Sequence, residues 1–307
     1  MIQNASKLCP YRFYTPVYNA SLRRYKSSVR FKKYDGEKPS FYVLYIKKSK
    51  CDECMYKKTC AYAFLFETIL PQENDILPGT DRGSHPFSFS VKKIQRENPL
   101  TDYNFTITLF GKAIEYLPYI YAAFVKSGKD GIFKKRTTFN VVDVQIGGKS
   151  ILVDENKLSM DFNVCEWGFT SKESQESTQL SEIFVELKSP LRFKVGGKYG
   201  TNFSAIDFMN CLFRRTKTMC SLYGKFDGGK YYPSESLKIV EKNIYWKSYR
   251  HYSARQKDLM ELGGSIGNLK IEGCFTSLEY ALLDFNKIAN AGKNTNFGLG
   301  QIDVWRK

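Results

Sequence analysis

The order of strand-like and helix-like segments in the second half of the chain constrains its fold more than any other sequence feature. Apolar residues recur at helical spacing in residues 203–222 and 277–289. Four runs typical of strands surround these two segments, namely residues 183–187, 245–252, 263–274 and 298–305. The order is strand, helix, strand, strand, helix, strand, which is the ferredoxin-like order of many RNA-recognition sheets. We therefore predict an α+β protein with an RRM-like second half.

The first half of the chain contains several strand-like segments and one amphipathic segment. The amphipathic segment, residues 111–127, is predicted to be a helix. The predicted strands are residues 8–18, 41–46, 87–94, 105–110 and 133–144. Residues 171–181 are rich in Ser, Glu, Gln and Thr, which indicates an exposed linker. At 307 residues the chain is long enough for about two domains, so we place them at residues 1–175 and 182–307.

A glycine-rich loop at residues 292–300 is the strongest candidate ligand site. Its glycines are Gly292, Gly298 and Gly300, and Lys293 and Asn294 add a cation and an amide. Because glycine has no Cβ, the backbone N–H groups of such a loop can face outward and hold a phosphate. The alternative is a turn that closes a hairpin. The loop lacks the spacing of nucleotide-binding motifs and leads into a strand instead of a helix, which argues against a nucleotide cofactor.

The chain carries an excess of positive charge and many aromatic residues. Lys and Arg number 47 against 31 Asp and Glu, which gives a formal net charge of +16 and indicates a polyanionic partner. The 21 Tyr and 23 Phe interleave with cations, a mixture that suits single-stranded nucleic acid or RNA loops; the alternative is that most rings are core residues. No stretch reaches the ~18 apolar residues of a membrane span, and the sequence shows no signal-peptide pattern. We therefore expect a cytoplasmic protein that binds no membrane.

Three cysteines lie close together in the first half. Cys51, Cys54 and Cys60 combine a Cys-x-x-Cys pair with a third thiol, and this pattern fits three tetrahedral zinc ligands. A fourth ligand is missing locally: Cys9 could supply it, or the turn could hold no metal. The other cysteines are scattered in apolar surroundings, which predicts reduced thiols in the core; they are Cys165, Cys211, Cys220 and Cys274.

Several short motifs occur in a specific order from about Cys51 onward. In the second half they are Ser-Pro-Leu-Arg at 189–192, the helical segment 208–223, Tyr-Ser-Ala-Arg-Gln at 252–256, Leu-Gly-Gly-Ser-Ile-Gly at 262–267 and the glycine-rich loop. In the first half they are the cysteine-rich turn, Leu-Phe-Glu at 65–67, His-Pro-Phe at 85–87 and Leu-Phe-Gly-Lys-Ala at 109–113. In this combination the chain resembles the CRISPR-associated repeat-processing endoribonucleases (Cas family six) of the RAMP superfamily.

The resemblance implies two tandem ferredoxin-like domains, the first with the cysteine-rich turn inserted, and a glycine-rich loop that lies against RNA. It also implies one cut in each repeat of the long CRISPR transcript, made without a metal ion or other cofactor and leaving a 2′,3′-cyclic phosphate. Repeat RNA is then the partner, and other CRISPR effector or adaptation proteins are further candidate partners in a prokaryotic cytoplasm. One departure is Ala289-Asn290-Ala291, where a His-containing segment is expected. The alternative function is a non-catalytic RAMP subunit that binds repeat or guide RNA.

Metal-free cleavage needs a base for the attacking 2′-hydroxyl, an acid for the departing oxygen, and cations around the phosphate. Histidine suits both proton roles because its ordinary pKa, ~6.5, lies near neutral pH, and the chain has two, His85 and His251. His251 lies in the segment that resembles the family most, while His85 precedes a proline that favours extended backbone. The family also uses sites built from Tyr and Lys, so Tyr252 with Lys293 is an alternative.

Cations near these residues are the candidate RNA contacts. Arg214, Arg215 and Lys217 lie on one predicted amphipathic helix, where they clamp phosphates or form a solvated basic face. Arg250 and Arg255 flank the second histidine, and there they would attract phosphate and favour the neutral imidazole that a base requires.

Overall fold

The computed structural model describes most of the chain beyond residue 62. The described residues are 63–70, 77, 80–94, 102–131, 138–154, 157–168, 179–226, 229–253 and 258–306. For residues 91–94, 102–103, 250–253 and 258–260 the description covers the backbone alone. The chain divides into two compact units. The first comprises Met1–Gln72, Lys93–Asn104 and Lys112–Cys165, and the second comprises Glu73–Lys92, Phe105–Gly111 and Glu166–Lys307.

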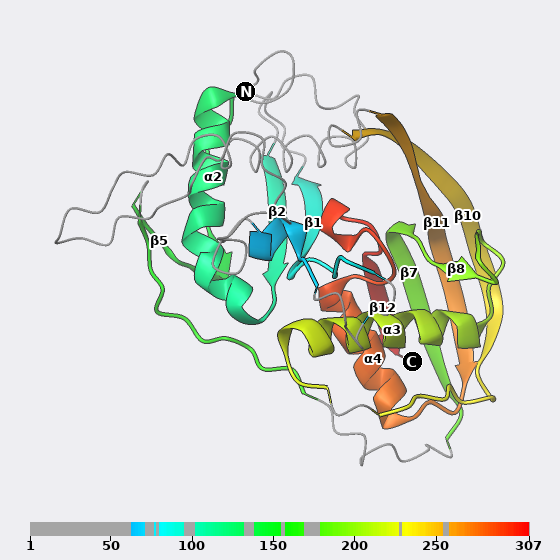
Figure 1. The fold of residues 1–307 in the computed structure, drawn as a ribbon. Coiled ribbons are helices and arrows are strands. Elements are labelled where there is room, and N and C mark those ends of the chain that lie inside the picture. Colours follow the sequence, from blue (N-terminus) through cyan, green and yellow to red (C-terminus); the bar gives the residue numbers. More distant parts are fainter. Residues whose placement is uncertain are drawn as a thin grey trace. The chain divides into compact units, whose positions relative to one another are not determined.

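An antiparallel sheet of four strands forms one layer of the second unit (Figure 1). Its spatial order is β10-β11-β7-β12, and the strands are β7 (Ser181–Leu191), β10 (Lys238–Ser253), β11 (Asp258–Gly273) and β12 (Ile302–Arg306). Along the chain, helix α3 (Ala205–Tyr223) lies between β7 and β10, and helix α4 (Ser277–Ala289) lies between β11 and β12. This is the ferredoxin-like arrangement, so the predicted element order of the second half is confirmed.

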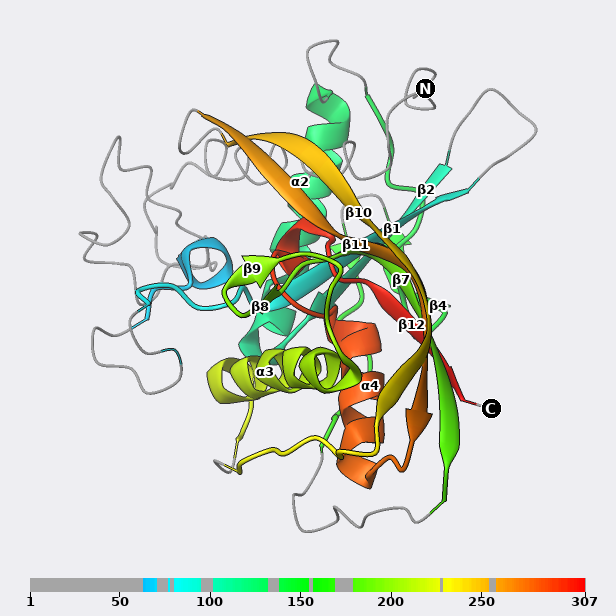
Figure 2. The same cartoon turned by 90° about the vertical axis from the view of Figure 1, so that its right-hand side faces the viewer.

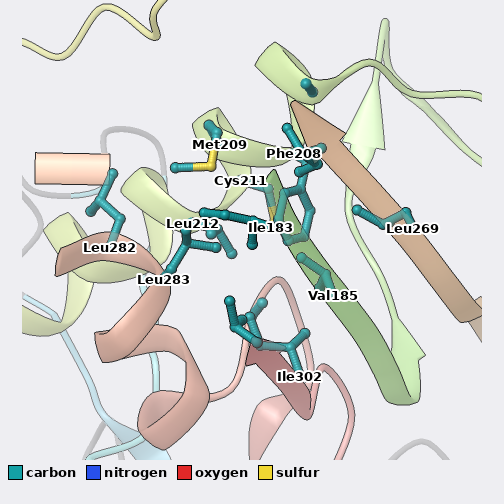
Figure 3. Packing of buried hydrophobic residues seen from close by; sticks show 14 of the residues in the cluster. Ile183, Val185, Phe208, Met209, Cys211, Leu212, Leu269, Leu282, Leu283 and Ile302 are labelled. Atoms are coloured by element: carbon teal, nitrogen blue, oxygen red, sulfur yellow. The ribbon is translucent and has the colours of Figure 1, made fainter. Parts of the chain in front are cut away.

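Helices α3 and α4 cover one face of this sheet because strand β7 alternates buried and exposed positions. Ile183, Val185 and Leu187 are buried, whereas Phe184 between them is exposed. The buried side chains pack with residues of both helices, and Figure 3 shows Leu283 of α4 among them. Burial of one such side chain contributes roughly 1.5–3 kcal/mol. A slip of one residue would move the whole apolar set to the other face, so this pattern fixes the register of β7.

Each of these two helices begins with a capping box that sets where it starts. The Ser204 hydroxyl accepts a hydrogen bond from the Asp207 N–H (3.1 Å), and the Asp207 carboxylate accepts one from the Ser204 N–H (2.9 Å). Thr276 and Glu279 form the same pair at α4. A cap of this kind stabilises a helix by about 1 kcal/mol. The predicted helices at 203–222 and 277–289 are confirmed, and the caps account for their observed starts.

Other elements of the first half also agree with the predictions. Strand β1 (Phe87–Ile94) pairs with β2 (Asp102–Leu109), and a 3-10 turn, η4 (Gly111–Tyr116), leads into helix α2 (Leu117–Asp130). The predicted strands at 87–94 and 105–110 and the helix at 111–127 are therefore confirmed. The remaining short elements are a π-helix, η3 (Ala63–Glu67), and the strands β3 (Gln145–Ile146), β4 (Lys149–Ser150), β5 (Leu152–Asp154) and β6 (Lys157–Leu158).

The predicted strand at 133–144 is wrong in its described part. Residues 138–144 form no strand, and the Val142 side chain is 86% exposed. The Asp143 carboxylate accepts hydrogen bonds from the Val144 N–H (2.8 Å) and the Ser150 hydroxyl (2.6 Å). These hydrogen bonds stabilise the turn that precedes the β3–β4 hairpin. The apolar residues of this run have no face to bury against, so their β propensity does not produce a strand.

Several predictions for the first half fall outside the described residues. They are the strands at 8–18 and 41–46 and the cysteine-rich turn with Cys51, Cys54 and Cys60. A ferredoxin-like first domain, its inserted turn and the boundary at residues 175–182 therefore stay predictions. Among the helices that the structure does describe, none is both long and apolar enough to cross a membrane.

Candidate functional site

The glycine-rich loop lies between α4 and β12 and needs its glycines for packing. Gly292, Gly298 and Gly300 all have positive φ, at 74°, 81° and 75°. A Cβ on Gly300 would lie 1.8 Å from the carbonyl oxygen of Ala291, and one on Gly292 would lie 2.6 Å from that of Arg192. No side chain fits at such separations, because the atom in the way belongs to the backbone. The glycines are therefore required by the fold of the loop itself.

Many N–H groups of this loop are bonded within the protein. The Lys293 N–H donates to the Arg192 carbonyl (2.8 Å), and the Gly300 N–H donates to the Pro190 carbonyl (3.1 Å). The N–H groups of Ala291, Phe297, Gly298 and Leu299 also donate to carbonyls of the loop. The prediction that the amides face outward as an anion cradle is wrong for these positions. The loop presents side chains instead, and the Lys293 side chain is exposed; whether it contacts RNA stays a prediction.

The cations predicted on α3 take two different roles. Arg214 and Lys217 are exposed, and the Lys217 ammonium lies 5.5 Å from the ring centre of Phe226. Arg215 is only 5% exposed and donates to the carbonyls of Ala289 (3.1 Å) and Asn290 (3.3 Å) at the end of α4. Burial lowers the pKa of Arg215 to about 10, so the side chain stays charged at neutral pH. The prediction that Arg215 is a phosphate clamp or part of a solvated basic face is therefore wrong. Its positive charge instead interacts favourably with the carbonyl groups at the C-terminal end of α4.

His85 lies just before strand β1, where its extended backbone was predicted. It is half-buried, and its ring stacks on that of Phe87 with the centres 5.6 Å apart. Burial, followed by the positive charges of Arg215 and Arg82, lowers the pKa of His85 to about 4. The imidazole is therefore neutral at pH 7, which is the form that a general base requires.

The residue before His85 is tied to the end of helix α3. The Tyr223 hydroxyl donates a hydrogen bond to the Ser84 carbonyl oxygen. Burial raises the pKa of Tyr223, and Arg215 opposes that shift. The buried amide of Asn290 donates to the Phe89 carbonyl (3.1 Å), so the segment where a histidine was expected also contacts β1. The structure thus brings His85 and Arg215 together at the end of α4.

The second histidine lies in the distal part of the β10–β11 hairpin. The backbone of His251 pairs with Met260, and that of Tyr252 pairs with Leu259. This part extends beyond the last pairing between β11 and β7, which joins Ser265 to Leu191. The predicted extended backbone is confirmed, while the side chains of Arg250, His251 and Tyr252 are among those not described. Arg255 lies outside the described residues.

One cation–ring contact lies beside the glycine-rich loop and was missed from the sequence. The Arg192 guanidinium lies 3.9 Å from the ring centre of Tyr199, and it also donates to the Gly263 carbonyl (2.9 Å). These residues bracket a short hairpin, β8 (Lys194–Val195) and β9 (Lys198–Tyr199). The Gly196-Gly197 pair between two lysines is the available sequence signal, because such a pair favours a two-residue hairpin turn.

The cysteines that the structure describes are all free thiols. Cys211 is buried, which raises its pKa to about 12, and Cys220 and Cys274 are partly buried. Cys165 is exposed, so its predicted place in the core is wrong. Within the described part of the chain no group of three His, Cys, Asp or Glu residues could hold a metal ion. The possible zinc ligands at Cys51, Cys54 and Cys60 lie outside that part.

The fold and the site together define a class of protein. A ferredoxin-like antiparallel sheet is typical of RNA-binding domains, and this domain has exposed cations on helix α3 and in the glycine-rich loop. Residues 185–302 match the family model of the CRISPR-associated endoribonuclease Cas6, and residues 42–161 match a family model described as an N-terminal domain. The predicted resemblance to the CRISPR-associated endoribonuclease Cas6 is therefore confirmed for residues 185–302.

Solved structures of Cas6 proteins show distant similarity to this chain. A Cas6 product complex is 15% identical with a TM-score of 0.42, covering 72% of this chain and 82% of that one. A partial Cas6-RT-Cas1–Cas2 complex is 11% identical with a TM-score of 0.40, covering 72% of this chain and 39% of that one. Cas6 of Thermus thermophilus is 15% identical with a TM-score of 0.30, covering 44% and 56%. No protein of curated function matches the sequence, so the similarity to the Cas6 family rests on residues 185–302.

Proposed function

We propose that this protein is a metal-independent endoribonuclease that cleaves precursor CRISPR RNA within its repeats. The 2′-hydroxyl before the cut attacks the neighbouring phosphorus, and the products are a 2′,3′-cyclic phosphate and a mature guide RNA. The observation that carries the proposal is the family match over residues 185–302, which spans nearly all of the ferredoxin-like sheet and its glycine-rich loop. The net charge of +16 suits a polyanionic substrate.

The reaction needs two proton transfers and a charge-neutralising group. A base takes the proton of the 2′-hydroxyl while its oxygen bonds to phosphorus, and an acid protonates the 5′-oxygen as its bond to phosphorus breaks. His85 is a candidate base because its lowered pKa keeps the imidazole neutral. His251 is the other candidate, with Tyr252 as acid. The exposed Lys293 is suited to neutralise the phosphate.

The decisive experiment is cleavage of end-labelled repeat RNA in excess EDTA. The same RNA is prepared with a single 2′-deoxy sugar at the cut. We expect wild-type protein to cut the first RNA in EDTA and to leave the second intact, because only the first carries the attacking hydroxyl. A cut that requires a divalent metal, or that persists in the deoxy RNA, would contradict the proposed mechanism.

The two histidine variants identify the base. If His85 is the base, His85→Ala should lower the single-turnover cleavage rate at least 10²-fold. The wild-type rate should then be flat between pH 6 and pH 8 and fall only near pH 4, because the pKa of His85 is about 4. His251→Ala is the matched variant. A full loss with His251→Ala and none with His85→Ala would transfer the role to His251, and no loss with either would direct attention to Tyr252 and Lys293.

A second candidate function is a non-catalytic RAMP subunit that binds repeat or guide RNA. Asn290 favours it, because this buried amide stands where the family resemblance leads one to expect a histidine. The EDTA experiment separates the two functions: tight binding of repeat RNA with no cut under any condition would establish the second. A structural zinc at Cys51, Cys54 and Cys60 remains a proposal that metal analysis of the purified protein tests, since a Cys60→Ser variant should lose the metal.

A further inference from the structure

The β8–β9 hairpin is held firmly at its base and is open at its tip. At the base, the Arg192 guanidinium donates to the Gly263 carbonyl (2.9 Å), and the Ser265 hydroxyl donates to the Gly200 carbonyl (3.2 Å). At the tip, Gly196 and Gly197 have positive φ, and a Cβ on either would meet nothing within 4 Å. The second unit therefore presents this tip to solvent on a fixed base (Figure 2).

The exposed cations of this hairpin have no acidic partner among the described residues. Lys194 and Lys198 are exposed on the two strands, and neither they nor Arg192 form an ion pair within the described part of the chain. The Tyr199 ring is bracketed by the Arg192 guanidinium at 3.9 Å and the Lys194 ammonium at 5.2 Å. Lys198 pairs with Val195, so its side chain lies on the other face of the same hairpin. Three positive charges on one short hairpin without a counter-charge favour an anionic ligand.

The hairpin is continuous with the glycine-rich loop and with helix α3. The Arg192 carbonyl accepts the Lys293 N–H (2.8 Å), so the loop is bonded to the residue that precedes the hairpin. The Gly292 N–H of the loop also approaches the buried Cys211 of α3, since it lowers the pKa of that thiol against the larger effect of burial. Arg214 lies one helical turn beyond Cys211 and is exposed, as is the side chain of Lys293. Three chain segments that carry exposed cations are therefore joined to one another.

The open face of the sheet, which is the RNA-binding face of RRM domains, has the opposite character. Phe184 and Trp305 are exposed there, at 36% and 49%. The nearest lysine, Lys270, is surrounded by three carboxylates, those of Glu182 (2.9 Å), Glu272 (3.0 Å) and Glu241 (3.8 Å). Lys188 is likewise paired, with Asp303. The lysines beside these exposed rings are thus paired with carboxylates, which disfavours binding of a phosphate backbone to this face.

We propose that the β8–β9 hairpin is an RNA-backbone site in which Lys194 and Lys198 each contact a phosphate. The Tyr199 ring holds Arg192 and Lys194 on one face of the hairpin, Lys198 extends from the other face, and the glycine-rich loop with Lys293 continues the site. RNA therefore binds at this edge of the domain instead of across the open sheet face. This inference rests on the proposed function, because it names further residues that hold the same RNA.

The test is the salt dependence of RNA binding by full-length protein. Labelled repeat RNA is titrated by fluorescence anisotropy at several salt concentrations, with the wild type and with Lys194→Ala/Lys198→Ala. We expect at least tenfold weaker binding at low salt. The slope of log K against log salt should become shallower by roughly 1.4–1.8, because each lost phosphate contact removes about 0.7 to 0.9. The melting temperature should be unchanged, since both lysines are exposed.

The matched control removes two lysines from other short hairpins. Lys149 and Lys157 are exposed on β4 and β6, so Lys149→Ala/Lys157→Ala changes the net charge by the same amount. We expect this variant to keep the wild-type slope. An equal loss in both variants, or none in the Lys194/Lys198 variant, would overturn the inference. Wild-type protein that binds no repeat RNA would instead overturn the proposed function, so the two failures are distinguishable.

Discussion

Arg215 shows how one side chain can be basic without being available to a ligand. Its two hydrogen bonds satisfy carbonyls at the C-terminal end of α4, just before the glycine-rich loop. Arg215→Ala would leave both carbonyls without this partner in a buried site, and we expect the free energy of unfolding to fall by about 2–4 kcal/mol in urea denaturation.

Arg214→Ala is the control for this prediction, because the two arginines are neighbours on α3 but Arg214 is exposed. Its stability should change by less than about 0.5 kcal/mol, while its affinity for RNA should fall. Equal stability losses in the two variants would mean that the buried hydrogen bonds of Arg215 contribute little in solution.

His85 should make the stability of the protein depend on pH. Its folded-state pKa of about 4 lies below the unfolded value of 6.5, so the unfolded chain takes up a proton first as the pH falls. The contribution of this residue is complete above pH 6.5, is lost between pH 6.5 and pH 4, and changes no further below pH 4. Between pH 7 and pH 5 the loss should be about 1–2 kcal/mol. Urea denaturation of the wild type and of His85→Gln at both pH values measures it, and the variant should lack this component; an identical pH dependence in the two proteins would contradict the lowered pKa.

At the scale of elements, two glycines with nearly equal φ allow the cost of backbone strain to be distinguished from the cost of steric overlap. Gly300 in the loop has a φ of 75°, and Gly197 at the hairpin tip has a φ of 80°. A Cβ on Gly300 would lie 1.8 Å from the Ala291 carbonyl oxygen, whereas a Cβ on Gly197 would meet nothing within 4 Å. Gly197→Ala should therefore cost about 1 kcal/mol of backbone strain. Gly300→Ala should cost at least about 2–4 kcal/mol, because the backbone must move. Thermal denaturation of both variants checks this order, and similar losses would show that the loop relaxes around a side chain.

At the scale of the whole molecule, the sequence predicted elements better than it predicted the site. Alternation at Ile183 to Leu187 and the helical spacing after Ser204 are local signals, and the structure follows them. The roles of Arg215 and of the loop glycines depend on atoms far along the chain, such as the Pro190 and Arg192 carbonyls, which no local pattern encodes. Residues 138–144 show the opposite: their local sequence favours a strand, but in the described structure Val142 packs against no other surface and stays exposed.

The bonds between the glycine-rich loop and the Pro190–Arg192 carbonyls also have a kinetic consequence. They join positions about a hundred residues apart. Closing so long a loop is slow, because the chain loses conformational entropy before the stabilising contacts form. Because these bonds need both partners, we expect the loop to acquire its shape only after β7 is in place and β12 has paired beside it. We therefore expect the proposed RNA surface to be among the last parts of this domain to form during folding, so that a nascent or partly folded chain holds no guide transcript.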